Sequence, residues 1–343
     1  MNEYKIIGID LANKVFQIAA LNQANKVVFN KKVSRTKFAK TIQLLPPSTI
    51  AMEACGSANY WARKFINMGH TIRLVPAQHV KAFVKGQNKN DAKDAVAICE
   101  AALRPNVHFV PIKTVEQQDL QMLHRVRQRF VAQRTALANQ IRAYLRENGI
   151  VVPAQLHNLV NALPFILEDA ENGLSDSARL LINMLFEELK QGKQRITEMD
   201  KQLKQKIAQD EDCQRLLDIP GYGPIVVTAL KAAVGNGTQF SSGRGLSACL
   251  GLTPRHHGTG GKTTIMDTTN AGNNYLRYLL IHGARTVITW CKNKDDKLSR
   301  WIKKLIERRG KHKTIVALAN KCARIAWALL TRKDTYNIKQ AVC

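Results

Sequence analysis

Short apolar runs and helically spaced apolar positions alternate over the first hundred residues. Strand-like runs occur at 4–10, 15–21, 26–29, 49–54 and 71–76. The second and third runs flank a short polar turn, which predicts a β-hairpin. Two helical stretches separate the later runs, so this part of the chain is predicted to form a mixed α/β sheet.

The two helical stretches have clear ends. Apolar residues recur with helical spacing before Pro46 and again over 58–68 before Gly69, and proline and glycine both stop helices. The resulting order is hairpin, helix, strand, helix, strand, which is the order of a ribonuclease-H-like sheet. Sheets of this kind bind their ligands at the carboxyl ends of the strands.

Two long helical patterns follow a connector at 104–111. They cover 116–148 and 176–210, and the segment between them contains prolines, a glycine and one expected short helix. Long amphipathic helices joined in this way predict an antiparallel arm. A plain helical bundle that serves as a spacer is the alternative.

The last part of the chain is predicted to be mainly helical. Helical patterns cover 275–290, 297–313 and 315–330, and the apolar third pattern is expected to pack under the basic second one. The predicted domains are therefore an α/β domain at 1–110, a helical coiled-coil arm at 111–212 and a C-terminal domain at 213–343.

The net charge is the most informative feature of the composition. The chain of 343 residues has 52 Lys and Arg against 26 Asp and Glu, a net charge of +26. Such an excess attracts polyanions, most often nucleic acid. An anionic membrane is the weaker candidate because the basic residues are not gathered in one amphipathic anchor.

Other features indicate a cytoplasmic protein without a membrane partner. The N-terminus does not resemble a signal peptide, and no apolar run is expected to reach transmembrane length. The seven scattered cysteines form no zinc-binding spacing and suit a reducing compartment.

Four acidic residues are placed where elements begin or end. Asp91 and Asp94 lie three residues apart at the start of an alanine-rich helix, and Asp10 and Glu53 each end a strand-like run. The helical pair alone is explained by the start of a helix capped by Asn90. Together, the four carboxylates are the hard oxygen ligands that suit Mg²⁺.

A glycine turn opens the C-terminal third of the chain. The stretch Ile219-Pro220-Gly221-Tyr222-Gly223-Pro224 precedes an alanine-rich helix. Two helices joined in this way resemble a helix-hairpin-helix, which binds DNA backbone through loop amides and a helix N-terminus. A tight structural turn explains the glycines nearly as well.

A second glycine-rich segment, 255–262, carries a hydroxyl group among bases. Thr259 stands between glycines, with His256 and His257 before it and Lys262 after it. Glycines allow the backbone to approach a phosphate, and the bases can neutralise it or move protons. An ordinary flexible loop is the alternative.

Basic residues on the helices and in this segment are candidates for contacts with nucleic acid, because a lopsided charge run favours such a face. The candidates are Arg125, Arg129, Arg134, Arg255, His257, Lys262, Arg277, Lys303, Lys304 and Arg308.

Taken together, these motifs resemble the DEDD transposases, the family of the bridge-RNA-guided insertion-sequence recombinases and the Piv-type DNA invertases. The similarity covers nearly the whole chain and includes several separated motifs in the same order. The motifs are GID at 8–10, MEACGS at 52–57, KNDAKDA at 89–95, IPGYGP at 219–224, ACLGLTPR at 248–255, GGK at 260–262 and YLRYLLIHGAR at 275–285.

The resemblance implies a RuvC-like fold whose Asp10, Glu53, Asp91 and Asp94 form the DEDD quartet and bind Mg²⁺. It further implies an arm for assembly into a dimer or tetramer, a noncoding guide RNA, and target and donor DNA as substrates. The carboxylates and the nucleophilic hydroxyl are expected to meet across protomers.

This chain departs from the family at the nucleophile. The family has a serine directly before the glycine, whereas this chain has Thr259. A threonine can attack a phosphate, although its methyl group crowds an in-line approach. Three outcomes are open: Thr259 is used, activity is impaired, or Thr263 replaces it. We predict Thr259.

The predicted function is Mg²⁺-dependent strand cleavage and exchange by a DNA transposase or site-specific recombinase. The alternative enzyme is a RuvC-like nuclease or junction resolvase that attacks with water. A non-enzymatic nucleic-acid-binding scaffold is a further alternative. An actin-like kinase fits less well because a second phosphate-binding glycine loop is missing from the sequence.

Overall fold

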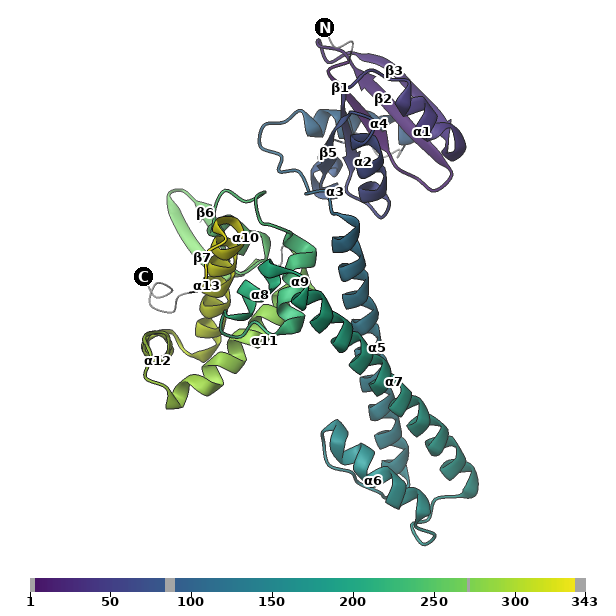
Figure 1. Ribbon diagram of the computed structural model, residues 1–343, viewed down its shortest axis with the longest axis vertical. Helices are drawn as coiled ribbons and strands as arrows, with labels where there is room; N and C mark the ends of the chain where they lie inside the picture. Colours follow the sequence, from purple (N-terminus) through teal and green to yellow (C-terminus); the bar gives the residue numbers. More distant parts are fainter. Residues whose placement is uncertain (1–3, 84–89, 270–271, 337–343) are drawn as a thin grey trace. The chain divides into compact units, whose positions relative to one another are not determined.

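The computed structural model describes residues 4–83, 90–269 and 272–336. They belong to two compact units, 1–115 and 116–343 (Figure 1), and each unit is described separately.

A five-stranded mixed sheet forms the centre of the first unit. Its strands are β1 (Ile6–Asp10), β2 (Val15–Leu21), β3 (Val27–Ser34), β4 (Thr49–Glu53) and β5 (Thr71–Val75). The strand order is β3-β2-β1-β4-β5, antiparallel on the β3 side of β1 and parallel on the β5 side. The predicted α/β class is confirmed.

The third strand is longer than its apolar pattern indicates. The sequence predicts a strand ending at residue 29, but the pairing with β2 continues to Ser34, which lies opposite Val15. Most side chains of β3 are exposed. An edge strand with exposed side chains is held by backbone hydrogen bonds, so its polar half leaves no apolar pattern to read.

Helices cover both faces of the sheet. They are α1 (Arg35–Gln43), α2 (Ala58–Ile66), α3 (Ala77–Lys81) and α4 (Asp91–Ala102). One face packs with α1 and α2 in a core that includes Phe16, Phe38 and Trp61. The opposite face packs with α3 and α4, where alanine and Cys99 let the helix lie close to the strands.

The closest approach of α4 to the sheet occurs at Gly8. A Cβ atom built on Gly8 would lie 2.3 Å from the Ala95 carbonyl oxygen and 2.5 Å from Cys99 Sγ. Only glycine allows this approach, because a real Cβ would displace the backbone of the helix.

We therefore expect Gly8→Ala to push α4 away from β1. Overpacking of this kind costs about 1–3 kcal/mol, and more where backbone must move. Chemical denaturation of the purified protein measures the loss, and Gly56→Ala is the matched control because a Cβ there meets nothing within 4 Å. Equal stability of the two variants would contradict the expectation.

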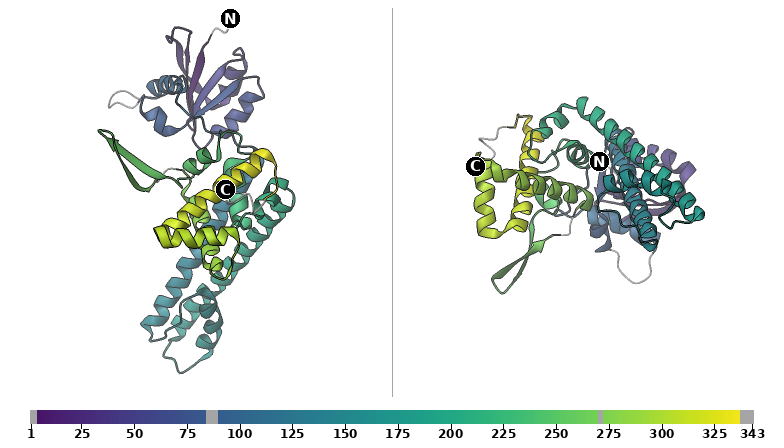
Figure 2. Two further views of the ribbon diagram at one scale, coloured as in Figure 1. Left: turned by 90° about the vertical axis from the view of Figure 1, so that its left-hand side faces the viewer. Right: turned by 90° about the horizontal axis from the view of Figure 1, so that it is seen from below.

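The second unit begins with an arm of three helices. These are α5 (Val115–Glu147), α6 (Leu156–Glu168) and α7 (Asp176–Ala208). The two long helices run antiparallel, because Arg127 of α5 pairs with Asp200 at 2.5 Å whereas Ile141 shares a core with Ile182. Figure 1 and Figure 2 both show α5 and α7 side by side.

The remaining elements form the helical core of the second unit. They are α8 (Glu211–Leu217), α9 (Pro224–Val234), α10 (Gly243–Cys249), β6 (Pro254–Thr259), β7 (Lys262–Thr268), α11 (Asn274–Trp290), a 3-10 turn (Cys291–Asn293), α12 (Lys297–Arg309) and α13 (Lys311–Arg332). The arm joins this core at His124, whose ring lies 3.0 Å from the Thr228 hydroxyl and 3.1 Å from the Tyr275 hydroxyl. Burial, with a smaller contribution from Arg127, lowers the pKa of His124 to about 4, so this contact is made by a neutral ring.

The boundary between the last two helices differs from the prediction. The basic helix ends at Arg309 because Gly310 has a φ of +79°, a conformation that suits glycine. Lys311 and Lys313 therefore belong to α13.

Among the described residues, α13 is the one helix long and apolar enough to cross a membrane. This differs from the expectation that no apolar run reaches such a length. Half of its most apolar 18-residue window is buried inside the protein, where Leu318, Cys322 and Ala326 join the core. Packing within the unit accounts for its apolar character.

The glycine turn between α8 and α9 packs directly against α11. Gly221 has a φ of +83°, and a Cβ on Gly283 would lie 2.2 Å from the Gly221 carbonyl oxygen. Close packing between backbones thus requires both glycines. This contact supports the interpretation of the two glycines as a tight structural turn. Binding of DNA by the turn stays a prediction.

Candidate active site

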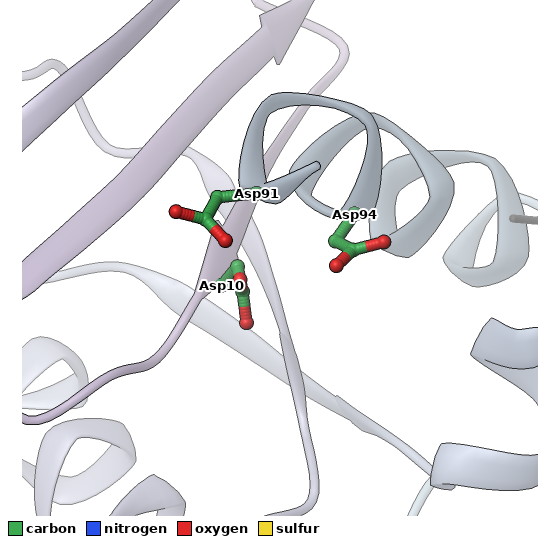
Figure 3. A group of neighbouring side chains, drawn as sticks. All are labelled: Asp10, Asp91 and Asp94. Atoms are coloured by element: carbon green, nitrogen blue, oxygen red, sulfur yellow. The ribbon is translucent and has the colours of Figure 1, made fainter. Parts of the chain in front are cut away.

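Three of the predicted acids converge in the first unit. Asp10 ends β1, and Asp91 and Asp94 lie in the first turn of α4. One carboxylate oxygen from each lies within 4.8 Å of the other two (Figure 3). Residues more than eighty positions apart therefore meet at the carboxyl end of β1, where a sheet of this type holds its ligands.

Glu53 lies on the neighbouring strand. β1 and β4 are parallel with Ile9 opposite Met52, so Asp10 and Glu53 are the next residues on the two strands. Side chains alternate along a strand, which places Glu53 on the same face as Asp10. Its carboxylate is half-buried and is not part of the three-residue group.

The start of α4 is built as the sequence predicts. The Asn90 side chain caps the helix by accepting a hydrogen bond from the Ala92 amide at 3.0 Å. Lys89, the first residue of the KNDAKDA motif, lies outside the described residues. Because Asn90 performs the capping, Asp91 and Asp94 are not needed for it.

The surroundings of Asp94 fit a cation. Asp94 is only 9% exposed, and its Oδ1 atom is buried without a hydrogen-bond partner among the described residues. A buried carboxylate oxygen without a donor is costly. A divalent ion would offset that cost, and a set of carboxylate oxygens suits Mg²⁺. The residues present therefore fit the ion that the resemblance implies.

Thr259 is placed at the tip of a β-hairpin in the second unit. β6 and β7 pair from Pro254 to Thr268, and Gly260 and Gly261 form the two-residue connection with φ of +56° and +78°. Two positive φ angles in such a connection are typical of a type I′ turn. The expected glycine loop is thus an ordered hairpin, and every residue of β6 is exposed.

Both hydroxyl candidates are presented by this hairpin. Thr259 lies opposite Lys262, and Thr263 lies opposite Gly258. Both threonines are exposed. The pairing makes Lys262 the cross-strand neighbour of Thr259, and a positive charge at that position favours an anionic group.

The predicted nucleic-acid-binding residues fall into two groups. Those with exposed side chains are Arg125, Arg129, Arg255, His257, Lys262, Lys304 and Arg308. The other three are half-buried: Arg134, Arg277 and Lys303. Arg277 donates to the Thr269 carbonyl at 3.1 Å and Lys303 to the Lys294 carbonyl at 2.8 Å. These two side chains hold local backbone.

Three polar residues on the sheet face that carries Asp10 were not among the candidates predicted from the sequence. Gln17 pairs with Asp10 across β1 and β2, Lys32 pairs with Gln17, and Asn30 lies nearby on β3. Lys32 Nζ lies 3.9 Å from Asp91 Oδ2, and both side chains are largely exposed. Gln17 lies in the run predicted at 15–21, whereas Asn30 and Lys32 lie in the part of β3 beyond residue 29 that was not predicted as a strand.

Comparisons with known proteins cover both halves of the chain. Residues 7–149 match a model of the DEDD transposases of the IS110 type, and residues 213–300 match one described as "Transposase IS116/IS110/IS902 family". The chain is 44% identical to the transposase for insertion sequence element IS1111A of Coxiella burnetii over 336 residues, which are 98% of this chain and 92% of the relative. The chain belongs to the IS110-type transposase family.

Two other relatives differ in their degree of similarity to this chain. A probable family 20 transposase of Pseudomonas aeruginosa is 44% identical over 331 residues, 96% of this chain and 98% of the relative. The pilin gene-inverting protein of Moraxella bovis is 23% identical over 351 residues, 96% of this chain and 97% of the relative. Both branches named from the motifs, transposases and invertases, are confirmed as relatives.

Proposed function

We propose that this chain is a DNA transposase or site-specific recombinase that cleaves and exchanges DNA strands with the help of Mg²⁺. The observation that carries the proposal is the convergence of Asp10, Asp91 and Asp94, with a buried Asp94 oxygen that lacks a donor. Relatives named transposases and gene-inverting proteins support DNA as the substrate.

The acids of the first unit would hold the ion. Asp10, Asp91 and Asp94 provide the nearest oxygens, and Glu53 on the same sheet face completes the DEDD set. Bound Mg²⁺ supplies charge neutralisation at the phosphate and stabilises the leaving oxygen. The carboxylates themselves would keep negative charge and oxygen ligands gathered at the end of β1.

The Thr259 hydroxyl is the proposed nucleophile. Its oxygen forms a bond to a DNA phosphorus while a bond from phosphorus to a sugar oxygen breaks. The hydroxyl proton leaves to a base, for which His256 and His257 on the same strand are candidates. The departing sugar oxygen takes up a proton. Exposure of Thr259 leaves room for its additional methyl group.

The second unit would assemble the recombinase. We propose that residues 111–212 act as an arm and residues 213–343 as the domain that presents the nucleophile, with the RuvC-like fold confined to residues 1–110. A dimer or tetramer of this chain is supported by apolar side chains on α7 that are exposed, Leu180, Leu181 and Met184. Surface leucine and methionine of this kind suit a contact between copies.

A guide RNA is the proposed additional partner. It rests on the family resemblance and is supported by the charge of +26 and by exposed basic side chains on both the arm and α12. The protein would then contact RNA mainly through its shape and backbone. The DNA that flanks the gene tests this partner: it is expected to contain short noncoding segments complementary to the insertion junction. The expected compartment is the cytoplasm.

Removal of divalent ions tests the proposed chemistry. Purified protein with its DNA and RNA is expected to lose strand cleavage in EDTA and to regain it when Mg²⁺ is added back, because the carboxylates alone repel a phosphate. Cleavage is measured on labelled junction DNA in a gel. Full cleavage in EDTA would contradict the proposal, and added Ca²⁺ in place of Mg²⁺ controls for simple charge screening.

A further inference from the structure

A line of polar side chains connects the outer strand of the sheet to the start of α4. Asp10, Gln17 and Lys32 are direct cross-strand neighbours on β1, β2 and β3. Asn30 lies two residues before Lys32, so it shares their face. This face is the one covered by α4.

Two hydrogen bonds run along this line. The Gln17 side-chain amide donates to Asn30 Oδ1, and Asn30 Nδ2 donates to the Ala92 carbonyl oxygen at 2.9 Å. Ala92 lies between Asp91 and Asp94 in the first turn of α4. A chain of contacts therefore extends from β2 to the helical turn that carries two of the three acids.

We propose that Asn30, supported by Gln17, is a positioning residue that sets the distance of Asp91 and Asp94 from Asp10. The inference rests on the proposed metal-binding function. Gln17 sits opposite Asp10 in the sheet, so the two hydrogen bonds connect the strand pair that holds one acid to the turn that holds the other two.

The chemistry of the side chains accounts for the residue types. Asn30 accepts a hydrogen bond from Gln17 and donates one to the Ala92 carbonyl oxygen. A side-chain amide can do both because it has a carbonyl acceptor and an NH₂ donor on the same planar group. An aspartate cannot donate, and an aliphatic residue can do neither. Gln17 is only 5% exposed, and its neighbours in the strand, Phe16 and Ile18, are fully buried, so the backbone that carries Gln17 is held in place.

The contact has a specific consequence for metal binding. Outer contacts that orient ligands typically change metal affinity by about 10–100-fold when removed. They need not change stability much, and Asn30 itself is exposed, so its replacement creates no cavity. Loss of affinity without loss of folding thus distinguishes a positioning role from a structural one.

The experiment measures Mn²⁺ binding to the full-length protein by electron paramagnetic resonance of the free ion. Asn30→Ala is compared with wild type and with Lys31→Ala, a matched control on the same strand whose side chain faces the other side of the sheet. Gln17→Met is the second variant, which keeps side-chain length and removes the hydrogen bond. Hydrogen exchange of the amides at residues 92–95 reports on the start of α4.

We expect Asn30→Ala to weaken Mn²⁺ binding about tenfold and to speed exchange in the first turn of α4, with a smaller effect for Gln17→Met and none for Lys31→Ala. Unchanged affinity and exchange in both variants would overturn the inference while the metal site stands. Wild-type protein that binds no Mn²⁺ would instead overturn the proposed metal centre, and the inference with it. If Asn30→Ala fails to fold, unchanged affinity in Gln17→Met alone overturns the positioning role.

Discussion

An Asp94→Asn variant is expected to lose strand cleavage by roughly 10³-fold while becoming no less stable. Asparagine keeps the shape of the side chain but removes a negative charge, and metal-assisted charge stabilisation is worth several kcal/mol in phosphoryl transfer. The Asp94 Oδ1 atom is buried without a donor among the described residues, so neutralising the group removes a cost of burial. Cleavage of labelled DNA and thermal melting measure the two effects.

The control for Asp94→Asn lies on the same helix. Glu100→Gln also removes one carboxylate from α4, but at the end of the helix away from Asp10 and Asp91. It is expected to cleave DNA like wild type. Normal cleavage by Asp94→Asn would show that the three acids do not form the catalytic centre, and a large fall in its melting temperature would show that Asp94 is structural.

The second large effect is expected at the hairpin tip. Thr259→Ala should lower the amount of covalent protein–DNA adduct by roughly 10³-fold or more, because the nucleophilic oxygen is removed. Thr259→Ser should retain the adduct and form it faster, since it removes only the methyl group that crowds the attack. Adducts are trapped by denaturation during the reaction and resolved on a protein gel with labelled DNA.

Thr263→Ala is the matched control, because Thr263 is an exposed threonine on the opposite strand of the hairpin. Mn²⁺ binding is expected to be unchanged in all three hairpin variants, since the acids belong to the other unit. An adduct that survives Thr259→Ala but not Thr263→Ala would assign the attack to Thr263. Cleavage without any adduct in wild type would instead favour a nuclease that attacks with water.

Much of the first unit could be predicted from local patterns. The runs that end at Asp10 and Glu53 became β1 and β4, and the start of α4 at Asp91 follows from Asn90 as its cap. These predictions succeed because burial of one strand face and capping of one helix end leave their signature within a few residues.

The predictions failed where backbone pairing or packing overrides the local pattern. The exposed half of β3 is held by hydrogen bonds to β2, and the expected loop around Thr259 is a hairpin because two adjacent glycines allow a tight connection. Neither of these depends on the local hydrophobic period alone.

The order of the elements, the excess of positive charge and the placement of acids at strand ends and at a helix start can all be read from the amino-acid sequence. Separated motifs in a constant order were sufficient to identify the family. The folded chain was needed to show which of those acids meet, that Gly8 allows α4 to lie against β1, and that Asn30 reaches Ala92 across 62 positions of the chain. The physical reason is that periodicity reports burial within one element, whereas contacts between elements depend on strand register and on the closeness of backbone packing.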